Sequence, residues 1–388
     1  MKMALPKTWS RSAVVSVCLM GANATGFASS AQVGSVSASD AAAQAFESEA
    51  IARFAQPWAM AFLPDGKLLV TERAGALKLL DPKTGQSLNV AGLPEVVYGG
   101  QGGLGDVVLH PQFANNQRIY ISYAEAGERN TAGAAIAQAT LVPTAEGAGL
   151  QDVRVIWRQV PKVTGRGHYA HRMQFDRDGF LWVSSGERQQ FDPAQDMQSN
   201  LGKVLKLNDD GSPAVGNPFA DQGGVAAQVW SLGHRNPLGM AFDPQGRLWV
   251  AEMGPRGGDE LNFIVRGENY GYPIVSNGDH YSGKPIPNHD TRPEFKAPAI
   301  TWTPVVSPSS LVIYTGDLFP DWKGNAFIGG LSSQALVRVA LTGESAQEVQ
   351  RFDMGERIRA VAQGPDGALW LLEDGNQGRL LRLSAPAR

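Results

Sequence analysis

The sequence has little cysteine, little net charge and no long helical pattern. Cys18 is the only cysteine among 388 residues, so disulfide bonds within the chain cannot stabilise the fold. The 34 basic and 37 acidic side chains give a formal net charge of −3, which argues against nucleic acid or an anionic membrane as the main partner. The hydrophobic fraction of 43% is large enough for a buried core and excludes wholesale disorder.

Acidic residues are also absent before Asp40, while three basic residues precede an apolar stretch of small side chains. This layout predicts a secretory signal peptide over residues 1–31; a disordered tail is the alternative. The stretch is too short and too interrupted for stable membrane insertion. We therefore expect a periplasmic or secreted protein, with a flexible segment over 32–48 and a single catalytic domain over 49–388.

One pattern recurs along the chain: an apolar run, a turn of the Pro-Asp-Gly kind, and a second, alternating apolar run. The Asp-Gly or Gln-Gly step tolerates a positive φ, so each copy predicts a β-hairpin. Four clear copies and then two looser ones are found at residues 57–73, 171–188, 236–253, 358–374, 104–125 and 311–331.

Strand-rich repeats of this period are typical of a β-propeller, whereas a helical solenoid would need long segments of 3.6-residue period. We predict an all-β fold, a six-bladed β-propeller with long loops at one end of its central channel. The long loops are expected at 126–150, 189–228 and 268–300. The alternative is a sandwich of unrelated hairpins.

Several histidines stand beside glycine-rich turns. His168 and His171 could be a metal pair, but residues three apart on a strand face opposite sides, and no third ligand follows from spacing. We interpret His168 as a general base near its ordinary pKa; the alternative is a hydrogen-bonded turn histidine. His280 and His289 lie in a polar insertion and are expected to be exposed.

Two arginine-containing segments suggest an anionic ligand. Arg235 and Asn236 precede a strand, and an arginine there offers donors to a carboxylate or a developing oxyanion. Arg357 and Arg359 share one face of an extended strand, without matching acids. The alternatives are an ordinary exposed loop pair and a solvated edge strand.

The segment EMGPRGGDELN, residues 252–262, combines turn-forming glycines with two carboxylates. Gly254 and Pro255 stand where backbone carbonyls are left unpaired, and Asp259 and Glu260 follow. Oxygen ligands of this kind suit Ca²⁺, although the spacing is not that of an EF-hand.

Taken in order, these segments resemble the soluble aldose sugar dehydrogenases that depend on pyrroloquinoline quinone (PQQ), the glucose/sorbosone dehydrogenase family. The resemblance runs from about residue 50 to the C-terminus. Its motifs are PWAMAFLPDG, GQGGLGDVVLHPQF, HYAHRMQFD, SLGHRNPLGMAFDPQGRLW, GPRGGDELN, ENYGYP and RIRAVAQGPDG. It implies a six-bladed propeller that oxidises the C1 hydroxyl of an aldose to a lactone, with PQQ and Ca²⁺ as cofactors and an unidentified electron acceptor.

The resemblance also implies roles for single residues. His168 matches the base, at the start of an H-x-x-x-R stretch, that takes the proton of the anomeric hydroxyl while a hydride passes to PQQ. Arg235 and Asn236 match cofactor contacts, with Arg235 near the carbonyl that becomes an oxyanion. Arg357 and Arg359 match the pair that faces the PQQ carboxylates.

Further matches concern the pocket and the metal. Gln101 matches a residue that lines the cofactor and substrate pocket. The carbonyls of Gly254 and Pro255 match ligands of the Ca²⁺ that PQQ also binds, where the ion acts as a Lewis acid. A second, structural Ca²⁺ is expected around Glu260 and the backbone of Tyr270.

Three departures from the family pattern are visible. The glucose-oxidising branch has a lysine near Ser332, but this chain has none after Lys323, so Ser332, Ser333 or Gln334 would replace that contact. Gly167 stands where one branch has an aspartate before the catalytic histidine. His171 stands where members usually have a small residue, which would narrow the pocket.

Two other function classes stay open. Propellers with Ca²⁺ include lactonases, in which the ion activates water. A non-catalytic sugar-binding propeller is the other alternative. The arginines at 235, 357 and 359 favour the dehydrogenase, because they have no use without an anionic cofactor.

Overall fold

The computed structural model describes residues 45–145 and 147–386. The predicted signal peptide over 1–31 and most of the segment 32–48 lie outside these residues, and the first strand begins at Glu47. None of the helices in the described residues is long and apolar enough to cross a membrane.

The described residues form mostly strands. The first twelve are β1 (Glu47–Phe54), β2 (Pro57–Phe62), β3 (Leu68–Glu72), β4 (Ala76–Asp81), β5 (Gln86–Ala91), β6 (Leu104–Leu109), β7 (Arg118–Ala126), β8 (Ala132–Thr144), β9 (Gly147–Arg158), β10 (Ala170–Phe175), β11 (Leu181–Ser185) and β12 (Lys203–Leu207). The others are β13 (Val229–Leu232), β14 (Pro237–Phe242), β15 (Leu248–Glu252), β16 (Asp259–Phe263), β17 (Ile300–Trp302), β18 (Pro308–Ile313), β19 (Ala326–Gly330), β20 (Ala335–Thr342), β21 (Ser345–Asp353), β22 (Ile358–Gln363), β23 (Leu369–Glu373) and β24 (Gly378–Ser384). The helices are α1 (Phe113–Asn116) and the 3₁₀ turns η1 (Asp192–Ala194), η2 (Ala220–Gln222), η3 (Ala226–Gln228), η4 (His289–Thr291) and η5 (Pro320–Trp322).

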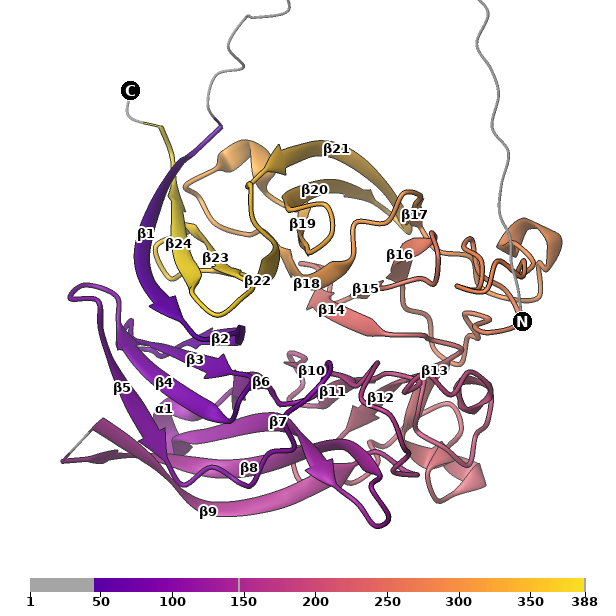
Figure 1. The fold of residues 1–388 in the computed structure, drawn as a ribbon, viewed down its shortest axis with the longest axis horizontal. Helices are drawn as coiled ribbons and strands as arrows, with labels where there is room; N and C mark the ends of the chain where they lie inside the picture. The colour runs from indigo at the N-terminus through magenta and orange to yellow at the C-terminus, as the bar shows by residue number, and fades with distance from the viewer. Residues whose placement is uncertain (1–44, 146, 387–388) are drawn as a thin grey trace, which may run out of the picture. The chain divides into compact units, whose positions relative to one another are not determined.

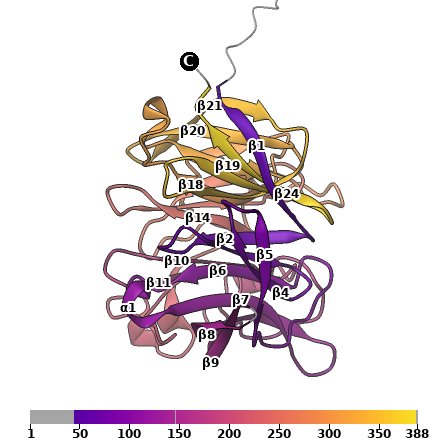
Figure 2. The same ribbon diagram turned by 90° about the vertical axis from the view of Figure 1, so that its left-hand side faces the viewer.

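These strands form five sheets within the described part of the chain. Four are four-stranded: β10 to β13, β14 to β17, β18 to β21, and β22 to β24 completed by β1. The fifth has eight strands, because β5 and β9 pair in parallel and join the antiparallel groups β2 to β5 and β6 to β9. β1 lies beside β24 in both ribbon views, so the two ends of the described chain share one sheet (Figures 1 and 2).

The first strands of the groups contact one another in a closed ring. β2 contacts β6, β6 contacts β10, and the contacts continue through β14, β18 and β22 back to β2. In Figure 1 these strands lie toward the middle of the view. The fold is therefore propeller-like, and residues at the ends of these strands converge on one region.

The predicted hairpins are confirmed. Each repeat forms an antiparallel pair, with β2–β3, β6–β7, β10–β11, β14–β15, β18–β19 and β22–β23 as the pairs. Gly66, in the first of these turns, has a φ of 85°, a value that glycine adopts without strain. Outside the β6–β7 pair, every residue of the second strand is buried, which explains its continuous apolar run.

One of the loop predictions is wrong. Residues 126–150 hold β8 and the start of β9, which pair along their length. Alanine and glycine dominate the start of β8 and are poor strand formers, so the segment carries no strand signal; packing between neighbouring strands decides its conformation. The segment 189–228 contains β12, whereas 268–300 is mainly irregular and contains η4.

A buried arginine joins the inner strands. Arg172 in β10 donates through Nη1 to Asp106 in β6 (3.2 Å), through Nε to the Leu238 carbonyl in β14 (2.8 Å), and through Nη2 to the Ser309 carbonyl in β18 (2.8 Å). Its guanidinium lies 3.9 Å from the centre of the Trp58 ring in β2. Five of the ring-forming strands therefore meet at one side chain.

We predict that Arg172→Met lowers the free energy of unfolding by ~3–5 kcal/mol, because it leaves the Asp106 carboxylate buried without its partner. Denaturant unfolding measures the loss. Arg247→Met, which removes a partly exposed ion pair with Asp243, is the control and should cost at most ~1 kcal/mol. Equal losses in the two variants would contradict the central role of Arg172.

Candidate active site

A cavity of about 330 Å³ opens among the ends of the inner strands, within the size range of small-molecule sites. Three arginines (Arg73, Arg357 and Arg359) and one aspartate (Asp374) give its lining an excess of two positive charges. The other lining residues are Trp58, Gly100, Gln101, Tyr169, Ala170, His171, Asn236, Leu238, Met253, Ser307 and Leu331. The lining therefore favours an anionic ligand with an apolar body.

The paired arginines meet an acid, so the prediction that Arg357 and Arg359 lack one is wrong. Arg357 Nε donates to Asp374 Oδ2 (2.9 Å), and Arg359 donates to Oδ1 through Nε and Nη2 (3.1 Å each). Burial would raise the pKa of Asp374, but the two guanidinium groups outweigh it and lower the pKa. Both arginines face the same carboxylate, and donors beyond those bonds are left for a ligand.

His168 is bound to a carboxylate that the sequence did not single out. Its Nδ1 hydrogen-bonds to Glu187 Oε1, and Glu187 Oε2 accepts the Phe191 amide (2.7 Å). Because an ionised carboxylate only accepts, Nδ1 carries the proton and Nε2 of the neutral ring keeps a free lone pair. None of the hydrogen bonds of the described residues uses Nε2, so His168 can act as a base.

The ionisation of this pair follows from burial. Desolvation lowers the pKa of His168, and the hydrogen bond to Glu187 opposes that shift without cancelling it; the expectation of an ordinary pKa is therefore wrong. Desolvation would raise the pKa of Glu187, but the hydrogen bond from His168 outweighs it and lowers the pKa. The stable form at neutral pH is a neutral imidazole beside an ionised carboxylate.

The backbone around this pair is strained. His168, Ala170 and His171 have φ values of 45° to 55°, and Arg188, Gln189 and Phe191 have values of 60° to 65°. Such values are uncommon for residues other than glycine and cluster at functional sites. The two segments also approach closely, since a Cβ on Gly186 would lie 2.1 Å from the His168 carbonyl oxygen.

Gln101 lines the larger cavity and also contacts the backbone of His168. Its Oε1 accepts the backbone N–H of His168 (2.8 Å), and its own N–H donates to the Arg166 carbonyl (2.7 Å). The predicted place of Gln101 in a pocket is therefore supported by the structure, which adds a contact to the His168 backbone.

Arg235 and Asn236 lie next to His168 and carry unused polar atoms. The carbonyl of Arg235 accepts the Glu187 amide (2.9 Å), and its Nη1 donates to the carbonyls of Met253 (3.0 Å) and Gly254 (2.6 Å). Arg235 Nε and Asn236 Oδ1 are buried without a hydrogen-bond partner in the described residues. Buried polar groups rarely stay unpaired, so both atoms point to a ligand.

The four residues expected to bind Ca²⁺ line one small cavity of about 10 Å³, room for roughly a single ion or water. They are Gly254, Pro255, Glu260 and Tyr270. Burial, and then the charge of Glu252 on the adjacent strand, raises the pKa of Glu260 well above its usual range. His289 donates to the Tyr270 carbonyl (3.1 Å) and is buried, so its expected exposure is wrong.

His171 borders the larger cavity as a neutral group. Its ring stacks on Trp58 with centroids 5.1 Å apart, and its Nδ1 hydrogen-bonds to Ser122 Oγ (2.7 Å). Burial lowers its pKa to about 3. Where the family has a lysine near Ser332, the cavity is lined by Leu331, while Ser332 is exposed and bonds to Ser307.

Sequence reasoning missed Arg73, Glu187 and Asp374, although hairpin register offers a signal for the two acids. Ala170 pairs with Ser185, so two steps beyond the paired strands place His168 opposite Glu187. In the same way Ile358 pairs with Glu373, and the next step places Arg357 opposite Asp374. Each acid could have been found by continuing the strand pairing past the hairpin.

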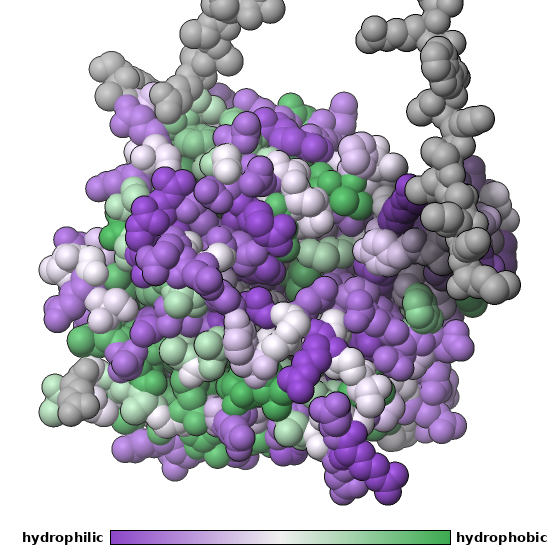
Figure 3. All heavy atoms as spheres, in the orientation of Figure 1, coloured by the Kyte–Doolittle hydropathy of each residue, from purple (hydrophilic) through white to green (hydrophobic). Residues whose placement is uncertain are grey.

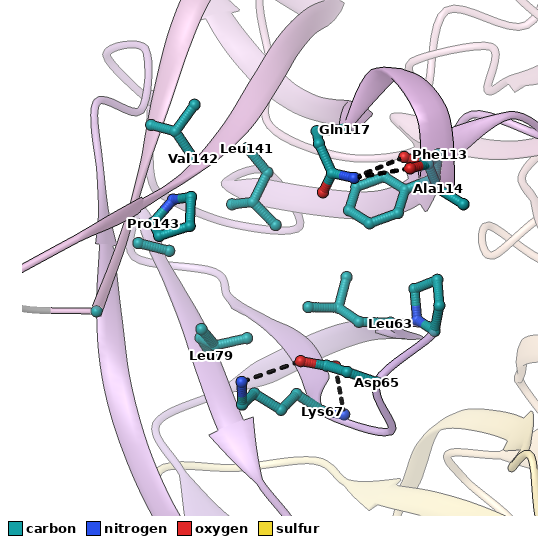
Figure 4. A pocket seen from close by; sticks show the side chains of 13 residues that line it. Leu63, Asp65, Lys67, Leu79, Phe113, Ala114, Gln117, Leu141, Val142 and Pro143 are labelled. Carbon is teal, nitrogen blue, oxygen red and sulfur yellow. Dashed lines mark hydrogen bonds and ion pairs between the residues drawn. The ribbon is translucent and has the colours of Figure 1, made fainter.

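A second pocket, of about 400 Å³, lies between the β2–β3 turn, α1 and β8 (Figure 4). Its wall is mainly apolar, with Leu63, Phe113 and Leu141 facing the opening and an Asp65–Lys67 ion pair at one side. It contains none of the predicted site residues. On the face shown in Figure 3, hydrophobic and hydrophilic side chains are interspersed and do not form one continuous apolar patch.

Comparison with known proteins places the chain in a family. The glucose/sorbosone dehydrogenase family matches residues 54–382. Aldose sugar dehydrogenase YliI of Escherichia coli (strain K12) is 40% identical over 336 residues, covering 84% of this chain and 90% of the relative. A crystal structure of the soluble aldose sugar dehydrogenase of Escherichia coli in the apo-form has a TM-score of 0.82 at 38% identity, covering 88% of this chain and all of that one. The PQQ-bound aldose sugar dehydrogenase of Streptomyces coelicolor has a TM-score of 0.72 at 30% identity, with 88% and 98% covered.

The burial of His171 predicts a pH dependence of stability. The unfolded chain binds a proton near pH 6.5 and the folded one near pH 3, so the free energy of unfolding falls as pH drops below 6.5. Between pH 6.5 and 4.5 this loss is ~2–3 kcal/mol, at 1.36 kcal/mol per pH unit. Urea unfolding at a series of pH values measures this loss. We expect the free energy of unfolding of His171→Gln to fall by ~2–3 kcal/mol less than that of the wild type between pH 6.5 and 4.5. The same fall in both proteins would contradict the low pKa of His171.

Proposed function

The chain belongs to the glucose/sorbosone dehydrogenase family, and from its site we propose that it is a quinoprotein that oxidises the C1 hydroxyl of aldose sugars to lactones. The observation that carries the proposal is the neutral, carboxylate-bound His168 beside the cationic cavity. A base with a free lone pair and an anion-binding cavity are the two elements that such a reaction needs from the protein.

The cavity fits PQQ, which is a flat tricarboxylate. Arg73, Arg357 and Arg359 outnumber the single Asp374, so the lining holds a net positive charge for carboxylates. The indole of Trp58 and the side chains of Leu238 and Leu331 offer apolar contact for the ring system. Asn236 Oδ1 in this lining, and Arg235 Nε in the wall of the smaller cavity, have no hydrogen-bond partner within the part of the chain that the structure describes and are available to polar atoms of the cofactor.

When bound, PQQ supplies a quinone that accepts a hydride from the C1 carbon of the sugar. His168 Nε2 accepts the proton of the C1 hydroxyl, and Glu187 stabilises the imidazolium that results through Nδ1–H. Gln101 and the Phe191 amide hold the two partners of this pair in place. Arg235 adds a fixed positive charge beside His168, which favours the neutral ring before proton transfer.

Calcium fits the residues around the smaller cavity. The carbonyls of Gly254, Pro255 and Tyr270 and the carboxylate of Glu260 are hard oxygen donors. The Gly254 carbonyl already accepts from Arg235, so the expectation that it is unpaired is wrong, and the Tyr270 carbonyl accepts from His289; each has its second lone pair for a cation, which would also relieve the repulsion between Glu260 and Glu252. We assign Gly254 and Pro255 to the Ca²⁺ that PQQ also binds, and Glu260 with the Tyr270 carbonyl to a structural Ca²⁺. All four residues line one small cavity, and Gly254 and Pro255 are not among the residues that line the cavity assigned to PQQ.

The architecture and location belong to the same proposal. Six four-stranded groups and their closed ring of inner strands support six blades, with β1 completing the last of them. The basic and apolar N-terminal sequence supports cleavage of a signal peptide and a periplasmic or secreted enzyme. The electron acceptor is a separate molecule.

The proposal predicts that reduction of a dye by a sugar requires PQQ, Ca²⁺ and His168 together. Protein mixed with PQQ and Ca²⁺ should reduce an artificial acceptor when given a panel of aldoses, and leaving out PQQ or Ca²⁺ should abolish the signal. His168→Ala should lower kcat by ~10²–10⁴ with PQQ binding retained, the scale of general-base catalysis. His110→Gln, beside α1, is the control; normal turnover in His168→Ala would remove His168 as the base.

Burial predicts unequal roles for the two arginines near Asp374. The Arg359 side chain is 11% exposed and that of Arg357 is 46% exposed, so a ligand gains more from the desolvated charge of Arg359. We expect Arg359→Met to raise the Kd of PQQ ~10–100-fold, about 1–3 kcal/mol, and Arg357→Ala to raise it less. Titration of PQQ measures both, with Arg382→Ala as a control outside the cavity. An unchanged Kd in Arg359→Met would exclude this wall as the carboxylate site.

A further inference from the structure

Arg188 is a buried cation to which the mechanism so far gives no role. Its side chain is fully buried, and none of the ion pairs in the described residues includes it. Burying a charged group without a carboxylate partner is costly unless its donors are all used. The donors of the Arg188 guanidinium must therefore be satisfied by uncharged acceptors.

Two of the three hydrogen-bond partners of Arg188 are backbone carbonyls in the irregular segment that leads into His168, and the third is a carbonyl in β8. Nε donates to the Gly167 carbonyl (2.8 Å), Nη2 to the Gly165 carbonyl (2.7 Å) and Nη1 to the Ala132 carbonyl (2.5 Å). The guanidinium also lies 3.6 Å from the centre of the Tyr169 ring. One side chain thus contacts the residues immediately before and after His168.

The backbone of Arg188 contacts His168 as well. Its N–H donates to the His168 carbonyl (3.2 Å), and the preceding residue is Glu187, whose carboxylate binds His168 Nδ1. Glu187 and Arg188 are consecutive, so one short segment holds both the imidazole and the peptide units on either side of it.

These contacts hold a strained stretch of backbone in place. His168 has a φ of 45° and Arg188 a φ of 61°, conformations that residues other than glycine rarely adopt and that persist only where the surroundings enforce them. Two of the carbonyl bonds of Arg188 fix the irregular segment from Gly165 to Gly167, which leads directly into His168. Without them the ring would lose its fixed orientation toward Glu187.

We propose that Arg188 is a positioning residue for His168: its guanidinium fixes the strained backbone around His168 and so keeps the imidazole on Glu187 with Nε2 free for the sugar hydroxyl. The inference rests on the proposed function for the role of His168 as base. The contacts of Arg188 with the His168 segment are independent of it.

The charge of Arg188 has a second effect on the same ring. The charged groups that face His168 are Glu187, Arg235 and Arg188; after desolvation and the Glu187 hydrogen bond, the two arginines lower the pKa of His168. Removing the charge of Arg188 should therefore let His168 protonate at higher pH. A buried cation that does not face His168 would not move that titration, and the tautomer of the ring reports its positioning separately from the charge effect.

The chain offers a matched control in Lys203. Its side chain is also fully buried, and its ammonium donates to the carbonyls of Pro193 (2.7 Å), Ala194 (3.1 Å) and Leu201 (2.8 Å). Lys203 is not among the charges that shift His168. Burial lowers the pKa of Lys203 to about 7, so below that pH Lys203→Met removes a buried cation, and at any pH it removes these carbonyl contacts, without touching the His168 segment.

The experiment compares Arg188→Met, Arg188→Lys and Lys203→Met in the PQQ- and Ca²⁺-loaded enzyme with an aldose and a dye. We expect Arg188→Met to lower kcat ~10–100-fold with the sugar KM changed less than ~3-fold, the pattern of a lost transition-state interaction. The acidic limb of its kcat profile should move up by as much as ~1 pH unit, the scale of a neighbouring charge. Arg188→Lys should restore the limb and part of kcat, and Lys203→Met should leave the limb in place.

A measurement without cofactor or sugar separates this inference from the proposed function. In protein labelled with ¹⁵N-histidine, His168 of the wild type should show a protonated Nδ1 and a bare Nε2, and in Arg188→Met a mixture of tautomers with titration at higher pH. This result in a protein that oxidises no sugar would support the positioning of His168 and refute the proposed function.

Two outcomes would overturn the inference. One is a His168 titration and tautomer in Arg188→Met equal to those of the wild type. The other is a loss of kcat that is the same in Arg188→Met and Lys203→Met with both acidic limbs unmoved. If Arg188→Met does not fold, Arg188→Lys carries the test, because it keeps the charge but cannot reach all three carbonyls; wild-type kcat and tautomer in that variant would overturn the inference.

Discussion

The fold depends on a single buried guanidinium in the ring of inner strands. Arg172 binds Asp106, the carbonyls of Leu238 and Ser309, and the ring of Trp58, and these partners come from four different strands. Ser309 Oγ in turn donates to the Ile358 carbonyl in β22 (2.6 Å), which brings in the remaining inner strand. Neighbouring strand groups are also linked in pairs, as by Thr71 Oγ1 to the Gly105 carbonyl (2.6 Å) and Ser184 Oγ to the Pro237 carbonyl (2.7 Å), but Arg172 joins five inner strands at once and so fixes how the strand ends face one another.

The candidate site lies on the same strands, a few residues from that contact. Arg172 is four residues after His168, and Trp58 packs on both Arg172 and His171. Fixing the inner strands therefore also fixes the cavity wall. On this rigid base the segments 168–171 and 188–191 adopt strained backbone conformations, and buried hydrogen bonds hold the base in one orientation.

Local chemistry explains what the sequence predicted well. The hairpins follow from turn glycines and apolar alternation. His168 and Arg235 attract attention because they stand at the edges of the hairpin repeats, whereas Gln101 is found only through the family resemblance. Long-range packing explains what it missed. β8 is a strand because β7 and β9 flank it, not because of its alanines, and the acid that binds Arg357 and Arg359 comes from the far side of a hairpin. Burial, which perturbs His168 and covers His289, is a property of the folded chain alone.

We propose above that a hydride leaves the C1 carbon of an aldose while His168 takes the hydroxyl proton. The most direct test is anaerobic mixing of the PQQ-loaded protein with a sugar and with the same sugar deuterated at C1, followed by the near-ultraviolet band of the bound quinone. The account predicts that sugar bleaches or shifts the band in a single turnover and that deuterium slows the change. A band that sugar leaves unaltered, in protein that has bound PQQ stoichiometrically, would contradict it.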